Sequence, residues 1–164
     1  MTDRAALVRI MRVEVTRGHL TCTVELASGI PRMTSCALAE HVIEDFPNLP
    51  RHACVNERGR AFADVMACTP VPHLLEHMIV DLQVHEMAKR DPLPGLADAL
   101  GGIPLVGTSE WLDEAAGLAR IDVSFADDLV ALRALRDAVT ALDDALAVVE
   151  ASRTFPRNAH HQVG

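Results

Sequence analysis

Residues 69–90 read TPVPHLLEHMIVDLQVHEMAKR, and this stretch predicts a long helix that is buried on two sides. Thr69 followed by Pro70 is typical of an N-cap and a first helical position. At about 100° per residue, one side of the helix carries an apolar stripe. That stripe consists of Val71, Leu74, Leu75, Met78, Ile79 and Leu82. The opposite side also carries Val80 and Val84, so we expect the helix to be sandwiched or to line a cleft.

Strand patterns with a period of two lie on both sides of this helix. Residues 7–15 and 19–26 alternate apolar and polar side chains around Gly18, which predicts a β-hairpin. Residues 118–125 alternate in the same way. A closing helix over about 128–152 follows, because its leucines and valines recur at three- and four-residue steps.

The order of these elements predicts an α+β fold, a single domain with a mixed or antiparallel sheet and helices packed on it. We expect the domain to span residues 1–152 and residues 153–164 to form a flexible C-terminal tail. Thr34 or Ser35 can cap a further helix that ends near Phe46. A short helix is expected near 61–67, and the Gly- and Pro-rich segment 96–107 receives no assignment.

Composition excludes several classes of function. The net charge of −8 disfavours binding to nucleic acid or to an anionic membrane, because both need clustered Lys and Arg. The chain holds one Trp, four Phe and no Tyr, too few aromatic rings for a base-stacking platform. It has neither an apolar run of membrane-spanning length nor a signal-peptide pattern, so we expect a cytoplasmic protein. Its four cysteines are typical of thiols or metal ligands and not of a disulfide framework.

Residues His73, Glu76 and His77 carry the chemistry that the sequence predicts. Histidines four residues apart on a helix point the same way, so both imidazoles can reach one metal ion. This is the His-x-x-Glu-His order of inverted zincins, in which Glu76 would act as the general base on a water. The alternative is a pair of histidines satisfied by the backbone and by Glu76, with no ion bound.

A hydrolytic zinc site needs a third protein ligand and an open position. The candidates from the residues alone are Cys54, His52, Cys68 and Glu150, and spacing does not decide between them. Orienting contacts to the ligands are expected from the same helix, and the candidates for them are Asp81, His85 and Glu86.

The stretch 46–83 resembles the N-terminal domain of cyanophycin synthetases, and the segment from about Leu118 to Leu142 is similar to that domain's closing strand and helix. The shared pattern runs from a Leu-Pro-x-Leu segment through a His-x-Cys pair to a helix that begins His-x-x-Glu-His and ends Leu-Gln. The matching residues are Pro47, Leu49, His52, Cys54, Phe62, Thr69, His73, Glu76, His77, Leu82 and Gln83. The Arg-Thr-Arg run expected near 105–109 is replaced by LVGTSEW.

This resemblance implies a domain that holds the Asp/Arg polymer and, in some members, hydrolyses it at a metal site. It implies Cys54, His73 and His77 as the ligands and Glu76 as the base. The ATP-grasp and Mur-ligase-like domains of the synthetases do not fit in the remaining residues, so we do not expect synthetase activity. The helix is also similar to that of pitrilysin-like peptidases, which would take Glu150 as a ligand, but those enzymes need domains larger than this chain.

The sequence therefore predicts a Zn²⁺-dependent hydrolase that cleaves a peptide or isopeptide-type amide, with an Asp/Arg-type polymer or another peptide as substrate. The alternative is a non-catalytic accessory module that binds a peptide or polymer. The apolar stripe of residues 128–152 could form a short dimer seam in a homo-oligomer, although it is shorter than the three or four heptads typical of one.

Overall fold

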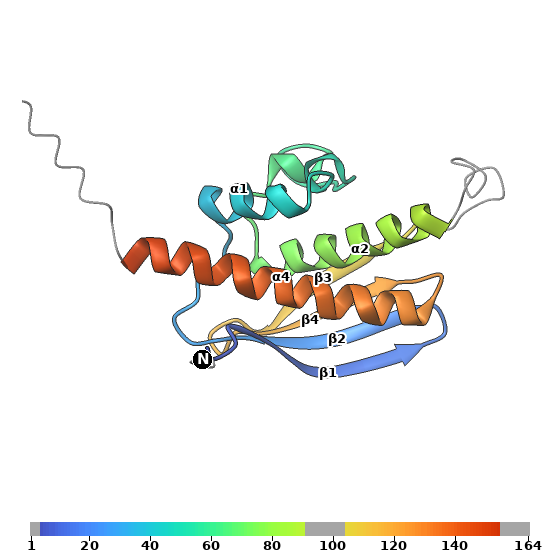
Figure 1. Cartoon of the computed structure of the whole chain (residues 1–164), viewed down its shortest axis with the longest axis horizontal. Helices are drawn as coiled ribbons and strands as arrows, with labels where there is room; N and C mark the ends of the chain where they lie inside the picture. The colour runs from blue at the N-terminus through green and yellow to red at the C-terminus, as the bar shows by residue number, and fades with distance from the viewer. Residues whose placement is uncertain (1–3, 91–103, 155–164) are drawn as a thin grey trace, which may run out of the picture.

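A four-stranded antiparallel sheet forms the base of the molecule in the computed structural model, which describes residues 4–90 and 104–154 (Figure 1). The strands lie in the order β1-β2-β4-β3. Their bounds are β1 Val8–Thr16, β2 His19–Leu26, β3 Gly107–Asp113 and β4 Leu118–Ser124. Two hairpins, β1–β2 and β3–β4, therefore meet along β2 and β4, and the predicted α+β class is confirmed.

Helices cover one face of this sheet. Helix α2 (Val71–Arg90) packs on β3 and β4, and α4 (Asp128–Thr154) packs beside it on β1 and β2 (Figure 1). Helix α1 (Cys36–Asp45) packs on α4. The two 3₁₀ turns of the segment that joins α1 to α2 are η1 (Leu49–Arg51) and η2 (Phe62–Asp64). They lie against each other, and η1 also contacts α2.

The alternation along β2 and β4 decides which face is covered. In β2 the residues Leu20, Cys22 and Val24 are buried, and the polar residues between them face the other side of the sheet. Each of the three pairs with a buried residue of β4, namely Val123, Ile121 and Ala119. A shift of one residue would place all of these side chains in water, so the hydrophobic pattern fixes the register.

Most of the expected elements are present. The first hairpin and the strand over 118–125 are confirmed, and Ser35 caps α1, because its Oγ accepts from the Leu38 N–H at 3.2 Å. Helix α4 runs to Thr154, two residues past the expected domain boundary at 152. The rest of the expected tail, 155–164, lies outside the described residues.

Three expectations differ from the structure. The long helix begins at Val71, one residue later than expected, because Pro70 forms a β-bridge with Met33 and the Val71 N–H donates to the Arg32 carbonyl. The short helix near 61–67 is only the 3₁₀ turn η2. Strand β3 was not predicted; it begins at Gly107, where the unassigned segment 96–107 ends, and residues 91–103 lie outside the described part of the chain.

Within residues 4–90 and 104–154, none of the helices combines the length and apolar character needed to cross a bilayer.

The β3–β4 turn is packed more tightly than the β1–β2 turn, which gives a test of the sheet. Gly117 and Gly18 both have positive φ, so alanine at either should cost about 1–2 kcal/mol of strain. A Cβ at Gly117 would also lie 2.4 Å from the Leu26 carbonyl oxygen, whereas nothing lies within 4 Å of one at Gly18. We expect Gly117→Ala to lower the free energy of unfolding by about 3 kcal/mol or more. Urea denaturation with Gly18→Ala as the control checks this, and equal losses would contradict it.

Candidate metal centre

Residues 52–62 form a small hairpin that faces the start of α2. The Cys54 N–H donates to the Arg60 carbonyl and the Phe62 N–H to the His52 carbonyl, both at 2.9 Å. Asn56 closes the tip, because its Oδ1 accepts from the backbone N–H groups of residues 58 and 59. Successive side chains of an extended segment point to opposite sides, so His52 and Cys54 point the same way, towards α2.

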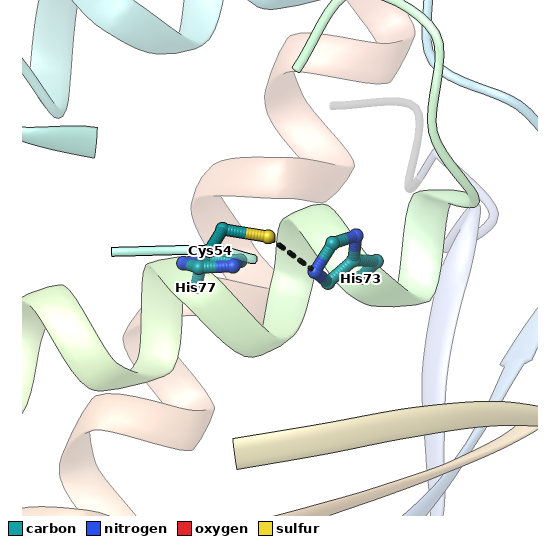
Figure 2. A group of neighbouring side chains, drawn as sticks. All are labelled: Cys54, His73 and His77. Atoms are coloured by element: carbon teal, nitrogen blue, oxygen red, sulfur yellow. Dashed lines mark hydrogen bonds between the residues drawn. The ribbon is translucent and has the colours of Figure 1, made fainter. Parts of the chain in front are cut away.

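The hairpin brings Cys54 to the two histidines of α2 (Figure 2). One ligand atom each from Cys54, His73 and His77 lies within 4.8 Å of the other two. The Cys54 Sγ lies 3.6 Å from His73 Nε2. His73 and His77 are one turn apart on the helix, as the sequence predicts. A thiol with two imidazoles is a soft donor set of the kind that binds zinc.

Burial keeps both imidazoles in the form that binds metal. It lowers the pKa of His73, and together with the nearby His73 and His52 it lowers the pKa of His77 to about 3. The Phe62 ring covers them: it stacks on His77 with ring centroids 3.9 Å apart and meets His73 edge-on at 5.3 Å. Neutral imidazole has one bare ring nitrogen, which is the atom that coordinates a metal.

Glu76 lies on the same side of α2 and is only 6% exposed. Burial raises the pKa of its carboxyl group to about 7, although the Ser109 hydroxyl, which donates to Glu76 Oε2 at 3.1 Å, acts in the opposite direction. Strand β3 has a glycine, Gly107, where it faces the Glu76 side chain, and the missing Cβ leaves space for that side chain. A Cβ at Gly107 would lie 2.6 Å from both Cγ and Oε1 of Glu76, so only glycine fits there without displacing it.

These groups line one cleft of about 870 Å³. The hairpin, α2 and the segment from Pro104 to Trp111 form its walls. Apolar side chains line much of it, among them Val80, Val84 and Trp111. This confirms the expectation that the second side of the helix lines a cleft. Its size is within the range of small-ligand and peptide-side-chain sites.

The other candidates for the third ligand are not in the cluster of Cys54, His73 and His77. His52 uses both ring nitrogens elsewhere: Nδ1 lies 3.2 Å from His77 Nδ1 and Nε2 lies 2.9 Å from Asp81 Oδ1. Cys68 is exposed, and Glu150 pairs with Arg153.

Of the residues expected to orient the ligands, Asp81 contacts His52, whereas Glu86 pairs with Lys89 and His85 is exposed. Two contributors were not predicted, Ser109 and Gly107. Both belong to β3, so their proximity to Glu76 depends on the pairing of β3 with β4.

No protein-family model matches this chain, and no curated protein matches it either.

The pKa of Glu76 gives a test of the site in metal-free protein. Because the folded chain holds this proton up to about pH 7 and a free carboxyl group releases it near 4.5, raising the pH between these values destabilises the native state. Glu76→Gln removes the titrating carboxyl group, so the variant does not lose this stability as the pH rises. We expect the free energy of unfolding of the variant, relative to wild type, to grow by roughly 3 kcal/mol between pH 4.5 and 7 and then to level off.

Urea denaturation in EDTA across this pH range measures the difference. Glu86→Gln is the control on the same helix, because the neighbouring Lys89 lowers the pKa of Glu86 and reverses the sign. A difference for Glu76→Gln that does not change with pH would show that this carboxyl group titrates as if it were in water.

Proposed function

We propose that this chain is a zinc-dependent hydrolase of a peptide or isopeptide-type amide, in which Cys54, His73 and His77 hold the metal and Glu76 is the general base. The observation that carries the proposal is the convergence of three donor atoms in a cleft that also holds a buried carboxyl group. A cleft that holds a carboxyl group with a pKa near 7 together with two imidazoles of lowered pKa is typical of catalytic sites.

The donor set supports zinc in a catalytic and not a purely structural role. Three protein ligands leave a fourth position open to water or substrate, whereas structural zinc sites use four protein ligands. When bound, zinc polarises the amide carbonyl and makes a water acidic enough to attack at neutral pH.

Glu76 has the properties that proton transfer requires. A pKa of about 7 lets the carboxylate accept a proton from the attacking water and then release it to the leaving amine. The Ser109 hydroxyl holds one carboxylate oxygen, Oε2, so the other remains free for the proton. Phe62 excludes water from one side of the histidines, which strengthens the electrostatic interactions within the site.

For the substrate we propose an Asp/Arg-type polymer or a related peptide, in line with the resemblance to cyanophycin synthetase N-terminal domains. The residues of the described chain that line the cleft include two acidic side chains, Glu76 and Glu110, and no Lys or Arg. This lining favours neutral or guanidinium-bearing segments over acidic ones. We also propose a cytoplasmic location, supported by the free thiol state of all four cysteines.

Zinc content and turnover, measured together, test the proposal. We expect wild-type protein to hold one zinc per chain, and Cys54→Ser, His73→Ala and His77→Ala to lose most of it. Glu76→Gln should keep the zinc and lose turnover by roughly 10²–10⁴-fold, because the amide cannot accept the proton. His85→Ala, on the exposed side of the same helix, is the control and should change neither.

The readings are metal analysis by mass spectrometry and hydrolysis of aspartyl-arginine polymer, isoaspartyl dipeptides and ordinary peptides. Full zinc in Cys54→Ser would overturn the ligand assignment. Zinc without hydrolysis of any of these substrates would favour the accessory module that binds without turnover.

A further inference from the structure

His52 and Asp81 lie beside the metal ligands and have no role in the proposed reaction. Asp81 follows His77 by one turn of α2, and His52 precedes Cys54 by two residues on the hairpin. The side chain of His52 is only 17% exposed and that of Asp81 only 12%, which is low for an ionisable pair. The imidazole of His52 lies between the other two side chains, 2.9 Å from Asp81 Oδ1 and 3.2 Å from His77 Nδ1.

The chemistry of these contacts assigns the protons. A carboxylate only accepts hydrogen bonds, so the His52 nitrogen that faces Asp81, Nε2, must carry a proton. If the His52 ring carries only that proton, its Nδ1 is bare and can only accept. Because two bare nitrogens 3.2 Å apart would repel each other, His77 must carry its proton on Nδ1. This leaves Nε2 of His77 bare.

We propose that Asp81 and His52 form a hydrogen-bond relay that locks His77 in its Nδ1–H tautomer and so reserves Nε2 for the metal. The inference rests on the proposed metal site, and it makes His52 and Asp81 positioning residues. A histidine without such a partner exchanges between tautomers and ring orientations, and each must be restricted when metal binds.

The second histidine of the site contacts the protein through the same ring atom. His73 Nδ1 lies 2.8 Å from the Thr69 hydroxyl oxygen, and His73 Nε2 is the nitrogen that faces the Cys54 Sγ. Both histidines therefore use Nδ1 to contact the protein. For His73 the contacting residue is Thr69, one turn earlier, and for His77 it is His52 of the hairpin.

The hairpin thus has two tasks. It supplies Cys54 as a ligand and, through His52, the acceptor that orients another ligand. Because extended backbone at residues 52–54 points both side chains towards α2, they approach the helix together. We infer that the docking of this hairpin on α2 organises the site before any metal binds.

Nitrogen-15 NMR of the histidine rings in metal-free protein at pH 7.5 tests the relay directly. We expect His77 as the Nδ1–H tautomer and His52 as the Nε2–H tautomer, with exposed His85 as a tautomer mixture for reference. The Nε2–H tautomer of His77, or a doubly protonated His52 that donates to a bare Nδ1 of His77, would overturn the proposal. This reading does not depend on zinc or on turnover.

Zinc affinity, measured by chelator competition, tests the consequence. His52→Asn keeps an acceptor oxygen near the position of Nδ1 and should retain the affinity within a few fold. His52→Leu removes the acceptor and should weaken zinc binding by roughly 10–100-fold. Thermal melting of both metal-free variants checks that they fold.

The two proposals fail in different ways. If wild-type protein binds no zinc but shows the expected tautomers, the relay stands and the metal function fails. If a folded His52→Leu binds zinc as tightly as His52→Asn, the relay is wrong and the metal site stands.

Discussion

Burial of the first half of α2 on both of its sides is the constraint on which the rest of this structure depends. Leu74, Leu75 and Ile79 fill the core, while Glu76 and His77 are buried on the side that faces the cleft. Every polar group on a helix buried in this way needs a hydrogen-bond partner. Among the described residues, no buried side-chain nitrogen or oxygen lacks one. The same loss of water that stabilises the core also shifts the ionisation of the site, so packing and reactivity have one cause.

The cleft is assembled from three segments that are far apart in the sequence. Helix α2 provides the histidines and the carboxyl group, the hairpin 52–62 provides the thiol and an aromatic cover, and β3 provides a hydroxyl group. Only the histidines and the carboxyl group are brought together within one element, the helix. The other two segments reach the helix because the sheet and the 3₁₀ turns place them there, which makes the site a property of the whole fold.

The difference between groups on one helix and groups from distant segments explains how much of the site the sequence could predict. Histidines at i and i+4 share a helix face wherever the helix lies, so His73 and His77 were predictable from spacing. Cys54 could be selected from four candidates only through a family resemblance, since no spacing rule relates a loop to a helix it packs against. Ser109 was not predicted, because the edge strand β3 begins with the small and polar residues 107–110. Its position depends on a pairing with β4 that no local pattern encodes.

Gly107 has no reactive group, yet it decides whether the carboxyl group of the helix has a place to lie. A descendant of this chain could therefore keep every letter of the His-x-x-Glu-His motif and lose the arrangement through one codon change in a distant strand. A substitution at this glycine would change the site without changing the motif. The motif alone therefore does not identify the site. The space that Gly107 leaves across the cleft is also needed.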